Sequence, residues 1–216
     1  MKVLTVGASG ATGQLVIQKL IARDHQVTGM ARTADQAAAI GRLGATPVNA
    51  DLERAETLPA AVADQEAVIF AAGSKGKQLD TVDKGGAISL IEAAGGSGVR
   101  RFVMLSSFYV GHPDAGPEKI RAYLWAKHEA DRYLEASTLD YTIVRPSWLT
   151  NGFETGRIAV SRYFDDPDAS ISRADVAETL VTALEVPETI RQTFEIISGS
   201  TPIRVALESV PGFTSC

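Results

Sequence analysis

Short apolar runs alternate along the chain with stretches in which apolar residues recur every three or four positions. The runs predict β-strands, and the stretches between them predict helices. Two runs, Val68-Ile69-Phe70 and Phe102-Val103-Met104-Leu105, are apolar without interruption, which is typical of strands covered on both faces. Strands are predicted at Lys2–Val6, Gln26–Ala31, Thr46–Asn49, Ala67–Ala72, Arg101–Ser106, Asp140–Arg145 and Thr193–Ile197.

Helices are predicted at Thr12–Arg23, Ala34–Arg42, Leu58–Ala63, Thr81–Gly95, Lys119–Ala136, Arg173–Leu184 and Pro202–Glu208. This alternation predicts an α/β fold, a Rossmann-type doubly wound parallel sheet with helices on both faces. We expect a single domain over 1–216, in which a short C-terminal extension, largely 146–192, forms the substrate side. Within it, Thr150–Asp168 is rich in glycine and aspartate and is expected to be an irregular loop that closes over a cofactor.

A glycine-rich segment, Gly7-Ala8-Ser9-Gly10-Ala11-Thr12-Gly13, lies between the first predicted strand and the first predicted helix. Residues without side chains let a phosphate approach the free N–H groups and the positive dipole at the start of a helix. We therefore expect Gly7, Ser9, Gly10, Ala11, Thr12 and Gly13 to bind the pyrophosphate of a dinucleotide. The alternative is a tight turn that binds no ligand.

The end of the second predicted strand bears on the choice of nucleotide. Arg32 and Thr33 follow it, and no carboxylate stands at the strand end. A guanidinium forks onto phosphate oxygens, so the pair favours NADP(H), while NAD(H) is the second choice. Arg32 could instead be a solvated surface charge.

Small and polar residues follow the third and fourth predicted strands. Asp51 and Leu52 are expected to border the adenine, or else to form only a loop turn. Ala71, Ala72 and Gly73 would let the backbone approach the ribose and pyrophosphate, although Gly73 could also serve only as a turn residue.

A second group of candidate residues follows the fifth predicted strand. Ser106 and Ser107 close that strand, and Tyr123 and Lys127 stand four apart, on one face of the next predicted helix. An ammonium and a positive nicotinamide stabilise a phenolate, and a serine hydroxyl holds a carbonyl oxygen. These groups would suffice for hydride transfer to or from a carbonyl. In the competing interpretation Tyr123 packs in the core and Lys127 is solvated.

Composition excludes several classes of protein. The chain has 216 residues and a formal net charge of −5, and its 21 Lys and Arg are scattered, so we expect no nucleic-acid partner. We expect no membrane segment and a cytoplasmic location, because no long apolar run and no signal peptide is present. We expect no metal site, because the three histidines lack ligand spacing and the one cysteine, Cys216, stands at the last position as an incidental residue.

The chain resembles the short-chain dehydrogenase/reductase superfamily, in particular its small atypical branch of NAD(P)-binding, NmrA-like and epimerase-like proteins. The resemblance spans nearly the whole chain. It rests on the glycine segment, Asp51-Leu52, Phe102-Val103-Met104-Leu105-Ser106-Ser107, Tyr123 with Lys127, Tyr141-Thr142-Ile143-Val144-Arg145-Pro146, and Ile171-Ser172-Arg173-Ala174-Asp175-Val176-Ala177.

The resemblance implies a role for each matching residue. Ser9 to Thr12 would cradle phosphate, Ser107 would be the catalytic serine, Tyr123 the acid-base group, and Lys127 the ligand of the nicotinamide ribose. Pro146, Ser147 and Trp148 would border the nicotinamide. Ser106 is expected beside the cofactor as well.

We therefore predict an NADPH-dependent oxidoreductase that reduces a small carbonyl or similar electrophile, acting as a monomer or homodimer. The alternatives are a non-catalytic NADP(H) sensor that regulates a partner protein, and a sugar-nucleotide epimerase or dehydratase. A substrate-facing Trp148 would favour an apolar or planar small-molecule substrate. The carboxylates Asp165, Asp166 and Asp168 are expected in a solvated loop, where they could repel acidic substrates.

Overall fold

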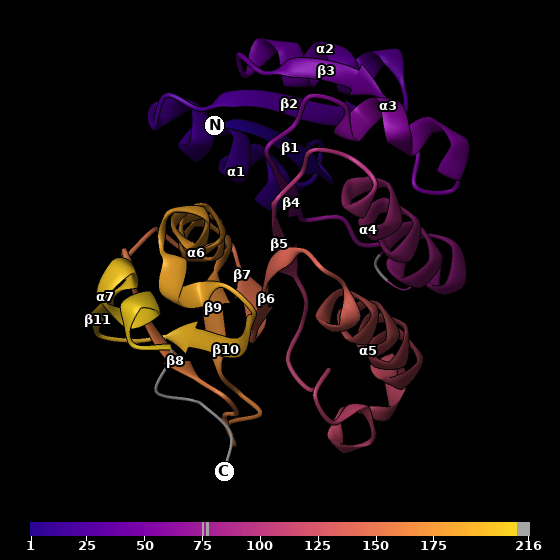
Figure 1. Ribbon diagram of the computed structural model, residues 1–216. Helices are drawn as coiled ribbons and strands as arrows, with labels where there is room; N and C mark the ends of the chain where they lie inside the picture. Colours follow the sequence, from indigo (N-terminus) through magenta and orange to yellow (C-terminus); the bar gives the residue numbers. More distant parts are fainter. Residues whose placement is uncertain (75, 77, 211–216) are drawn as a thin grey trace.

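A mostly parallel sheet, nine-stranded in the part of the chain described, runs through the molecule (Figure 1). The computed structural model describes residues 1–74, 76 and 78–210, so Cys216 lies outside the described residues. In order across the sheet the strands are β3 (Thr46–Asn49), β2 (Gln26–Ala31), β1 (Lys2–Val6), β4 (Ala67–Phe70), β5 (Arg101–Leu105), β6 (Asp140–Pro146), β10 (Gln192–Ser198), β8 (Arg157–Ser161) and β11 (Thr201–Pro202).

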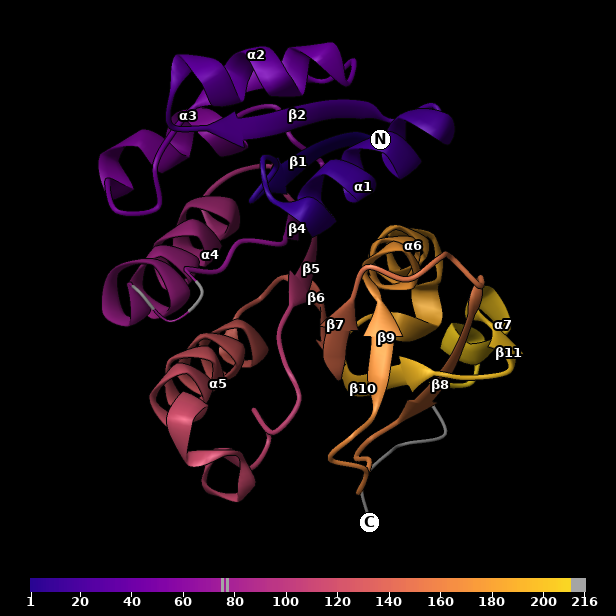
Figure 2. The same ribbon diagram turned by 180° about the vertical axis from the view of Figure 1, so that it is seen from behind.

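Neighbouring strands are parallel from β3 to β10, whereas β8 is antiparallel to both β10 and β11. A separate parallel pair, β7 (Trp148–Thr150) and β9 (Ser170–Ser172), lies beside the sheet, as seen from behind in Figure 2. The central order β3-β2-β1-β4-β5-β6 is that of a Rossmann fold. The predicted fold class is therefore confirmed.

Helices cover both faces of the sheet. One face carries α1 (Ala11–Ala22), α2 (Ala34–Arg42), α6 (Arg173–Glu185) and α7 (Ile203–Glu208), and the other carries α3 (Leu58–Val62), α4 (Ala87–Gly95) and α5 (Arg121–Ala136). Single turns of 3-10 helix lie at Ala55–Thr57, Pro113–Ala115, Glu118–Ile120 and Pro187–Thr189.

The core lies in two layers, one on each side of the sheet. Successive residues of β1 show this, because Val3 packs in the layer of α1 and α6, and Leu4 packs in the layer of α4 and α5. Val103 and Phe102 of β5 divide in the same way, and all four side chains are fully buried. Burial on both faces is the physical reason for the uninterrupted apolar runs in the sequence.

Several segments differ from the predicted elements, since β7, β9 and β11 are not among the predicted strands and two longer segments also differ. The predicted loop Thr150–Asp168 contains β8, which lies between β10 and β11 in the sheet and whose Ile158 and Val160 pack in the layer of α1 and α6. The predicted helix Thr81–Gly95 starts as a π-helical turn, Leu79–Gly86, before α4 begins. Gly85 permits this wide turn, since a Cβ there would lie 2.6 Å from the carbonyl oxygen of Asp80.

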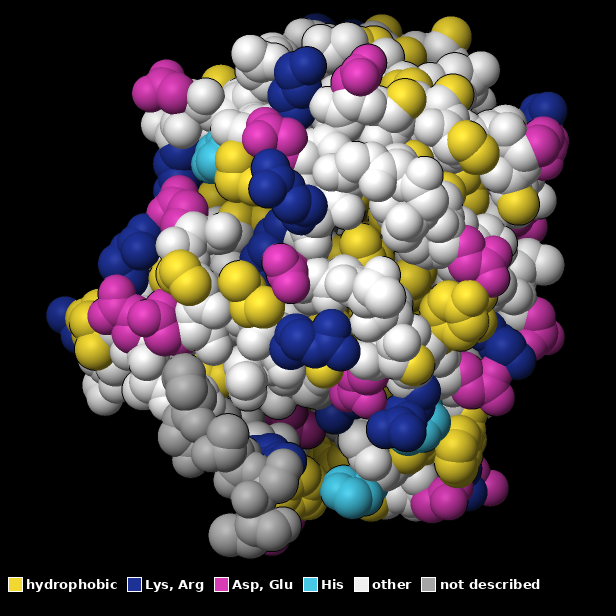
Figure 3. All heavy atoms as spheres, in the orientation of Figure 1, with side chains coloured by type: hydrophobic (Ala, Val, Ile, Leu, Met, Phe, Trp, Pro, Cys, Tyr) yellow, Lys and Arg dark blue, Asp and Glu magenta, His cyan; other side chains and the backbone are white. Residues whose placement is uncertain are grey.

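The surface mixes charges of both signs. On the face shown in Figure 3, Lys and Arg side chains are interspersed with Asp and Glu. Among the described helices, none combines the length and the apolar character that crossing a bilayer requires.

Candidate active site and cofactor groove

The glycine turn between β1 and α1 is fixed by close backbone contacts. Gly7 has a φ of +78°, and a Cβ there would lie 2.6 Å from the carbonyl oxygen of Ala71. A Cβ at Gly13 would lie 2.1 Å from the carbonyl oxygen of Gly7. Packing alone therefore requires glycine at both positions. Gly10 differs, because its Cβ would meet only the Gly7 oxygen, at 3.2 Å.

The amino-terminal end of α1 is open toward solvent. Gly10 is the N-cap and supplies no side-chain acceptor to the first turn of the helix. The N–H groups of that turn have no acceptor within the helix, so they can bind an anion. Ser9 and Gly10 are exposed, while Thr12 is buried.

Three cavities form one groove across the carboxyl ends of the parallel strands. The outer cavity is lined by Gly7, Ser9, Gly10, Met30, Arg32, Gln36, Asp51, Leu52, Ala71, Ala72, Gly73, Ser74, Gln78 and Val82. The central cavity, of about 490 Å³, is lined by Gly10, Ala11, Thr12, Ala71, Ala72, Gly73, Leu105, Ser106, Ser107, Tyr123, Lys127, Pro146, Ser147, Leu149, Asn151 and Arg173. The aromatic cavity is lined by Ser107, Phe108, Tyr109, Ile120, Ser147, Trp148, Leu149 and Arg173.

Shared residues connect the three cavities. Gly10 and the segment 71–73 line both the outer and the central cavity. Ser107, Ser147, Leu149 and Arg173 line both the central and the aromatic cavity. The groove therefore runs from Arg32, past the glycine turn, to Trp148.

A carboxylate lies nearer to Arg32 than the sequence suggests. Glu53, which follows β3, places a carboxylate oxygen 3.9 Å from the Arg32 guanidinium. The expectation of no acid near this strand end is wrong, because the loop after β3 folds back beside β2. Thr33 lines a neighbouring surface hollow instead of the outer cavity, and its hydroxyl accepts the Gln36 N–H at 3.3 Å as the cap of α2.

Asp51 combines a structural role with a place in the groove. Its carboxylate accepts the Glu53 N–H at 3.2 Å, and its own N–H donates to the Thr57 hydroxyl at 3.0 Å. Asp51 and the buried Leu52 both line the outer cavity. The turn and the groove are thus built by the same residues.

A buried polar network lies beneath the central cavity. The Asp131 carboxylate, which is fully buried, accepts the Ser106 hydroxyl at 2.8 Å and the Arg145 Nε at 3.0 Å. Lys127, one turn earlier on α5, is 1% exposed, and its Nζ donates to the Leu105 carbonyl at 2.8 Å. Burial lowers the pKa of Lys127, and burial raises the pKa of Asp131.

Tyr123 lines the central cavity, and its hydroxyl makes no hydrogen bond with any described residue. Burial raises the pKa of its phenol, and the charges of Asp83 and Asp131 raise it further. Stabilisation of a phenolate by Lys127 together with a positive nicotinamide stays a prediction, because it requires the bound cofactor. The Lys127 ammonium donates its hydrogen bond to the Leu105 carbonyl and not to the Tyr123 phenol.

Residues at the end of β6 and directly after it lie where the central and aromatic cavities meet. Pro146 and Ser147 line the central cavity, and Trp148 lines the aromatic cavity with 44% of its surface exposed. The Trp148 indole donates to the Pro167 carbonyl at 2.8 Å, which fixes the ring. Arg173 lies among these residues and was not predicted as a site residue. Its place in Ile171-Ser172-Arg173-Ala174-Asp175-Val176-Ala177, directly before a predicted helix, was the available signal.

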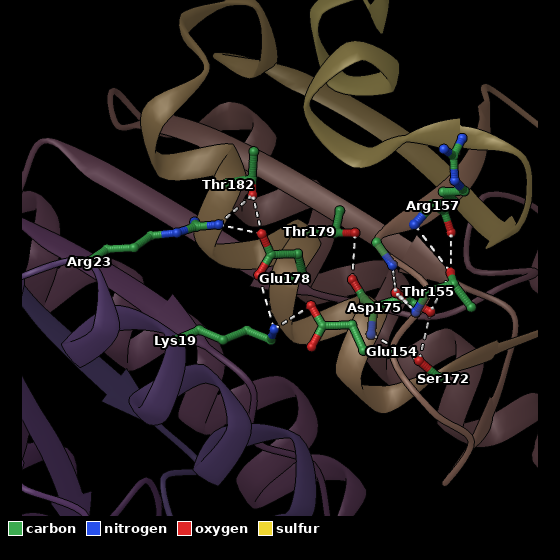
Figure 4. A network of polar contacts seen from close by, with 11 residues as sticks. Lys19, Arg23, Glu154, Thr155, Arg157, Ser172, Asp175, Glu178, Thr179 and Thr182 are labelled. Carbon is green, nitrogen blue, oxygen red and sulfur yellow. Dashed lines mark hydrogen bonds and ion pairs between the residues drawn. The ribbon is translucent and has the colours of Figure 1, made fainter.

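A network of polar contacts holds the segment 151–156 against α1 and α6 (Figure 4). The Asp175 carboxylate accepts the N–H groups of Thr155 and Gly156 at 2.9 and 2.8 Å. Glu154 pairs with Lys19 of α1 at 2.7 Å, and Lys19 also pairs with Glu178 of α6 at 3.0 Å. This segment begins at Asn151, which lines the central cavity, so the network fixes one wall of the groove.

Residues 7–187 match a protein family described as NAD(P)H-binding. The chain belongs to this NAD(P)H-binding family. The matched range contains every residue that lines the three cavities. The prediction that the chain binds NAD(P)H is thereby supported, as is the resemblance to the NAD(P)-binding, epimerase-like branch.

Related proteins carry the names of both epimerases and oxidoreductases. A Bacillus subtilis protein named "Uncharacterized sugar epimerase YhfK" is 38% identical over 216 residues, covering 97% of this chain and 100% of that protein. A solved structure from Bacillus halodurans, named for NAD-dependent epimerases/dehydratases, is 39% identical with a TM-score of 0.92, covering 97% of this chain and 99% of that chain. The structure of the oxidoreductase ylbE from Lactococcus lactis is 31% identical with a TM-score of 0.89, covering 100% of both chains.

Proposed function

We propose that the chain is an NADPH-dependent oxidoreductase that reduces a small carbonyl compound or a similar electrophile by hydride transfer. The central cavity carries the proposal, because Ser107, Tyr123 and Lys127 share it with the amino-terminal end of α1. The family match supports the NAD(P)H-binding part, and the likeness to an oxidoreductase supports redox chemistry.

The residues of the groove fit a dinucleotide. The first turn of α1 has no side-chain cap, and the exposed Gly10 leaves room in front of it, so Gly10, Ala11 and Thr12 would hold the pyrophosphate. Arg32 at the far end of the outer cavity would hold the phosphate that distinguishes NADP(H) from NAD(H). The Lys127 ammonium has one hydrogen-bond acceptor among the described residues, so two of its N–H groups are available to the ribose.

A reduced nicotinamide, when bound, supplies the hydride. The Ser107 hydroxyl donates a hydrogen bond to the substrate carbonyl oxygen and so polarises the carbonyl carbon. As the C=O bond becomes a single bond, the Tyr123 phenol transfers its proton to that oxygen, and water in the open cavity returns a proton to Tyr123. The raised pKa of Tyr123 keeps the phenol protonated at neutral pH, which is the form a proton donor requires.

The test is steady-state oxidation of NADPH with a panel of aldehydes, ketones and quinones. We expect Tyr123→Phe to lower turnover by about 10²–10⁴-fold and to leave NADPH affinity nearly unchanged, since only the phenolic oxygen is removed. Tyr133→Phe is the matched control, because Tyr133 lies on the same helix, is 39% exposed and donates to Glu92. It should turn over like the unmodified protein.

The same experiment separates the competing functions. Binding of NADPH without oxidation by any member of the panel would favour the nucleotide sensor. Interconversion of a nucleotide sugar without net oxidation of NADPH would favour the epimerase, the activity in the name of the Bacillus subtilis relative. Unchanged turnover in Tyr123→Phe would remove Tyr123 from the mechanism.

A further inference from the structure

The aromatic cavity differs in character from the rest of the groove. Apolar and aromatic side chains form most of its lining: Phe108, Tyr109, Ile120, Trp148 and Leu149. Among its described lining residues Arg173 is the one that carries a charge. A cavity with aromatic walls and one guanidinium favours a flat ligand that carries one anionic group, because aromatic rings stack on planar groups.

No carboxylate of the described residues forms an ion pair with Arg173. Its Nη1 donates to the Leu149 carbonyl at 3.3 Å and to the Asn151 side-chain oxygen at 2.7 Å. Its other two guanidinium nitrogens make no hydrogen bond or ion pair within the described part of the chain. Neutral acceptors therefore orient the guanidinium while two of its nitrogens stay available.

No described carboxylate lines either the aromatic or the central cavity. In particular, Asp165, Asp166 and Asp168 are not among the residues that line them. An anionic ligand in these cavities would therefore meet the positive groups of Arg173 and Lys127 and no lining acid.

A second unsatisfied group stands beside Arg173. Ser147 is 4% exposed and lines both cavities, and its hydroxyl is buried without a hydrogen-bond partner among the described residues. A buried hydroxyl without a partner costs free energy, which an acceptor on a ligand would recover. Ser147 and Arg173 together provide N–H and O–H donors at the junction of the two cavities.

The fold holds Arg173 firmly in place. It is the first residue of α6, and the preceding Ser172 caps that helix by accepting the Asp175 N–H at 3.0 Å. The Asp175 carboxylate in turn anchors Thr155 and Gly156, as Figure 4 shows. A donor held in this way loses little conformational freedom when it binds a ligand.

We propose that the substrate is a flat, apolar carbonyl compound that bears a carboxylate, and that Arg173 with Ser147 binds this carboxylate. A carboxylate fits better than a phosphate, since the planar guanidinium matches it and the apolar walls offer few further donors. The inference rests on the proposed function for the position of the reacting carbonyl. Binding of the carboxylate itself requires no turnover, so the two can fail separately.

The experiment compares two probes that differ by one charge. Terephthalaldehydic acid is an aromatic aldehyde with a carboxylate across the ring, and its methyl ester is neutral. We expect calorimetric titration of the full chain preloaded with NADP⁺ to show that the acid binds about ten- to a hundredfold more tightly than the ester. Arg173→Met should bring the acid down to the affinity of the ester, and Arg173→Lys should retain part of the preference.

Two further variants protect the test against a simple folding defect. Ser147→Ala should weaken binding of the acid by about three- to tenfold, since one hydrogen bond is lost. Arg132→Met is the matched control, because Arg132 has a side chain 69% exposed on α5 and does not line the groove. It should bind both probes as the unmodified protein does.

Several results would overturn the inference. The unmodified protein could bind acid and ester with equal affinity, or bind neither probe. The preference for the acid could also survive in Arg173→Met. A loss of NADPH affinity in Arg173→Met as large as the loss for the acid would assign Arg173 to the cofactor instead. If the acid binds through Arg173 but its aldehyde is not reduced when NADPH replaces NADP⁺, the carboxylate site stands and the proposed function fails for this class of substrate.

Discussion

Gly10 is the residue at which cofactor binding can be separated from folding. Gly7 and Gly13 are needed by the backbone, whereas a Cβ at Gly10 meets a single oxygen at 3.2 Å, and its φ of −76° and ψ of 161° suit other residues. We expect Gly10→Val to fold and to bind NADPH at least about a hundredfold more weakly, because the branched side chain fills the space before α1. Fluorescence titration with NADPH measures the affinity.

Circular dichroism of the same variant provides the control for folding. Gly13→Val is the contrasting case, since its Cβ would lie 2.1 Å from the Gly7 oxygen, and we expect it to be destabilised as well as unable to bind. A folded Gly10→Val protein with normal affinity for NADPH would show that the pyrophosphate does not bind at this turn.

We expect Arg32 and Glu53 together to set the choice between NADPH and NADH. Arg32→Ala should remove most of a preference for NADPH of about ten- to a hundredfold, the usual contribution of a charge-assisted phosphate contact. Glu53→Gln should strengthen the preference by about two- to fivefold, because the partly exposed carboxylate 3.9 Å away competes weakly for the guanidinium. Parallel calorimetric titrations with the two nucleotides give the ratio. Equal affinities in the unmodified protein would contradict this assignment.

At the scale of elements, Glu195 makes the contact between β10 and the segment after β8 depend on pH. Its side chain is 3% exposed and accepts the Phe164 N–H at 2.8 Å. Burial raises the pKa of Glu195 from 4.5 to about 6. The Glu195 carboxyl therefore holds its proton more tightly in the folded protein than in the unfolded chain. The protonated carboxyl stabilises the fold fully below pH 4.5, and this stabilisation is lost as the pH rises through about 6.

Glu195→Gln should remove this dependence, since the amide keeps an acceptor for Phe164 and never ionises. We expect the variant to match the unmodified protein at about pH 4 and to exceed it by up to about 2 kcal/mol in unfolding free energy at about pH 7.5. Urea denaturation at both values measures the difference. A variant that is less stable at the higher value would show that the ionised carboxylate is a net stabilising group.

The strands could be predicted from the sequence where their side chains are buried on both faces of the sheet. The buried strands β1, β4, β5 and β6 follow from apolar runs because helices cover both of their faces. β8 escaped prediction because it is short, its Ile158 and Val160 alternate with Arg157, Ala159 and Ser161, and it lies between segments rich in glycine and aspartate. The π-helical turn before α4 depends on the contact of Gly85 with the Asp80 carbonyl, which no periodicity reveals.

At the scale of the whole molecule, the site is assembled from segments far apart in the sequence. The positions of Ser107, Tyr123 and Lys127 followed from a local motif on one strand and one helix, and these residues do share a cavity. Glu53 beside Arg32 and Asp131 beside Arg145 depend on how loops and strands meet in three dimensions, so local spacing does not reveal them. Arg173 lies in a motif that the sequence shows, but its place beside Trp148 and Leu149 depends on the pairing of β7 with β9.

NADPH binding should stabilise the entire fold, because the residues that line the groove come from both halves of the sheet. The groove does not exist in the unfolded chain, so NADPH binds only the folded protein. At about a hundred times its dissociation constant, a ligand that binds only the native state contributes about 2.7 kcal/mol, or a rise of about 5–11 °C in melting temperature for a chain of this size. Scanning calorimetry with and without NADPH tests this expectation. Gly10→Val should show no rise, Tyr123→Phe should show the full rise, and an unchanged melting temperature of the unmodified protein would refute NADPH as its ligand.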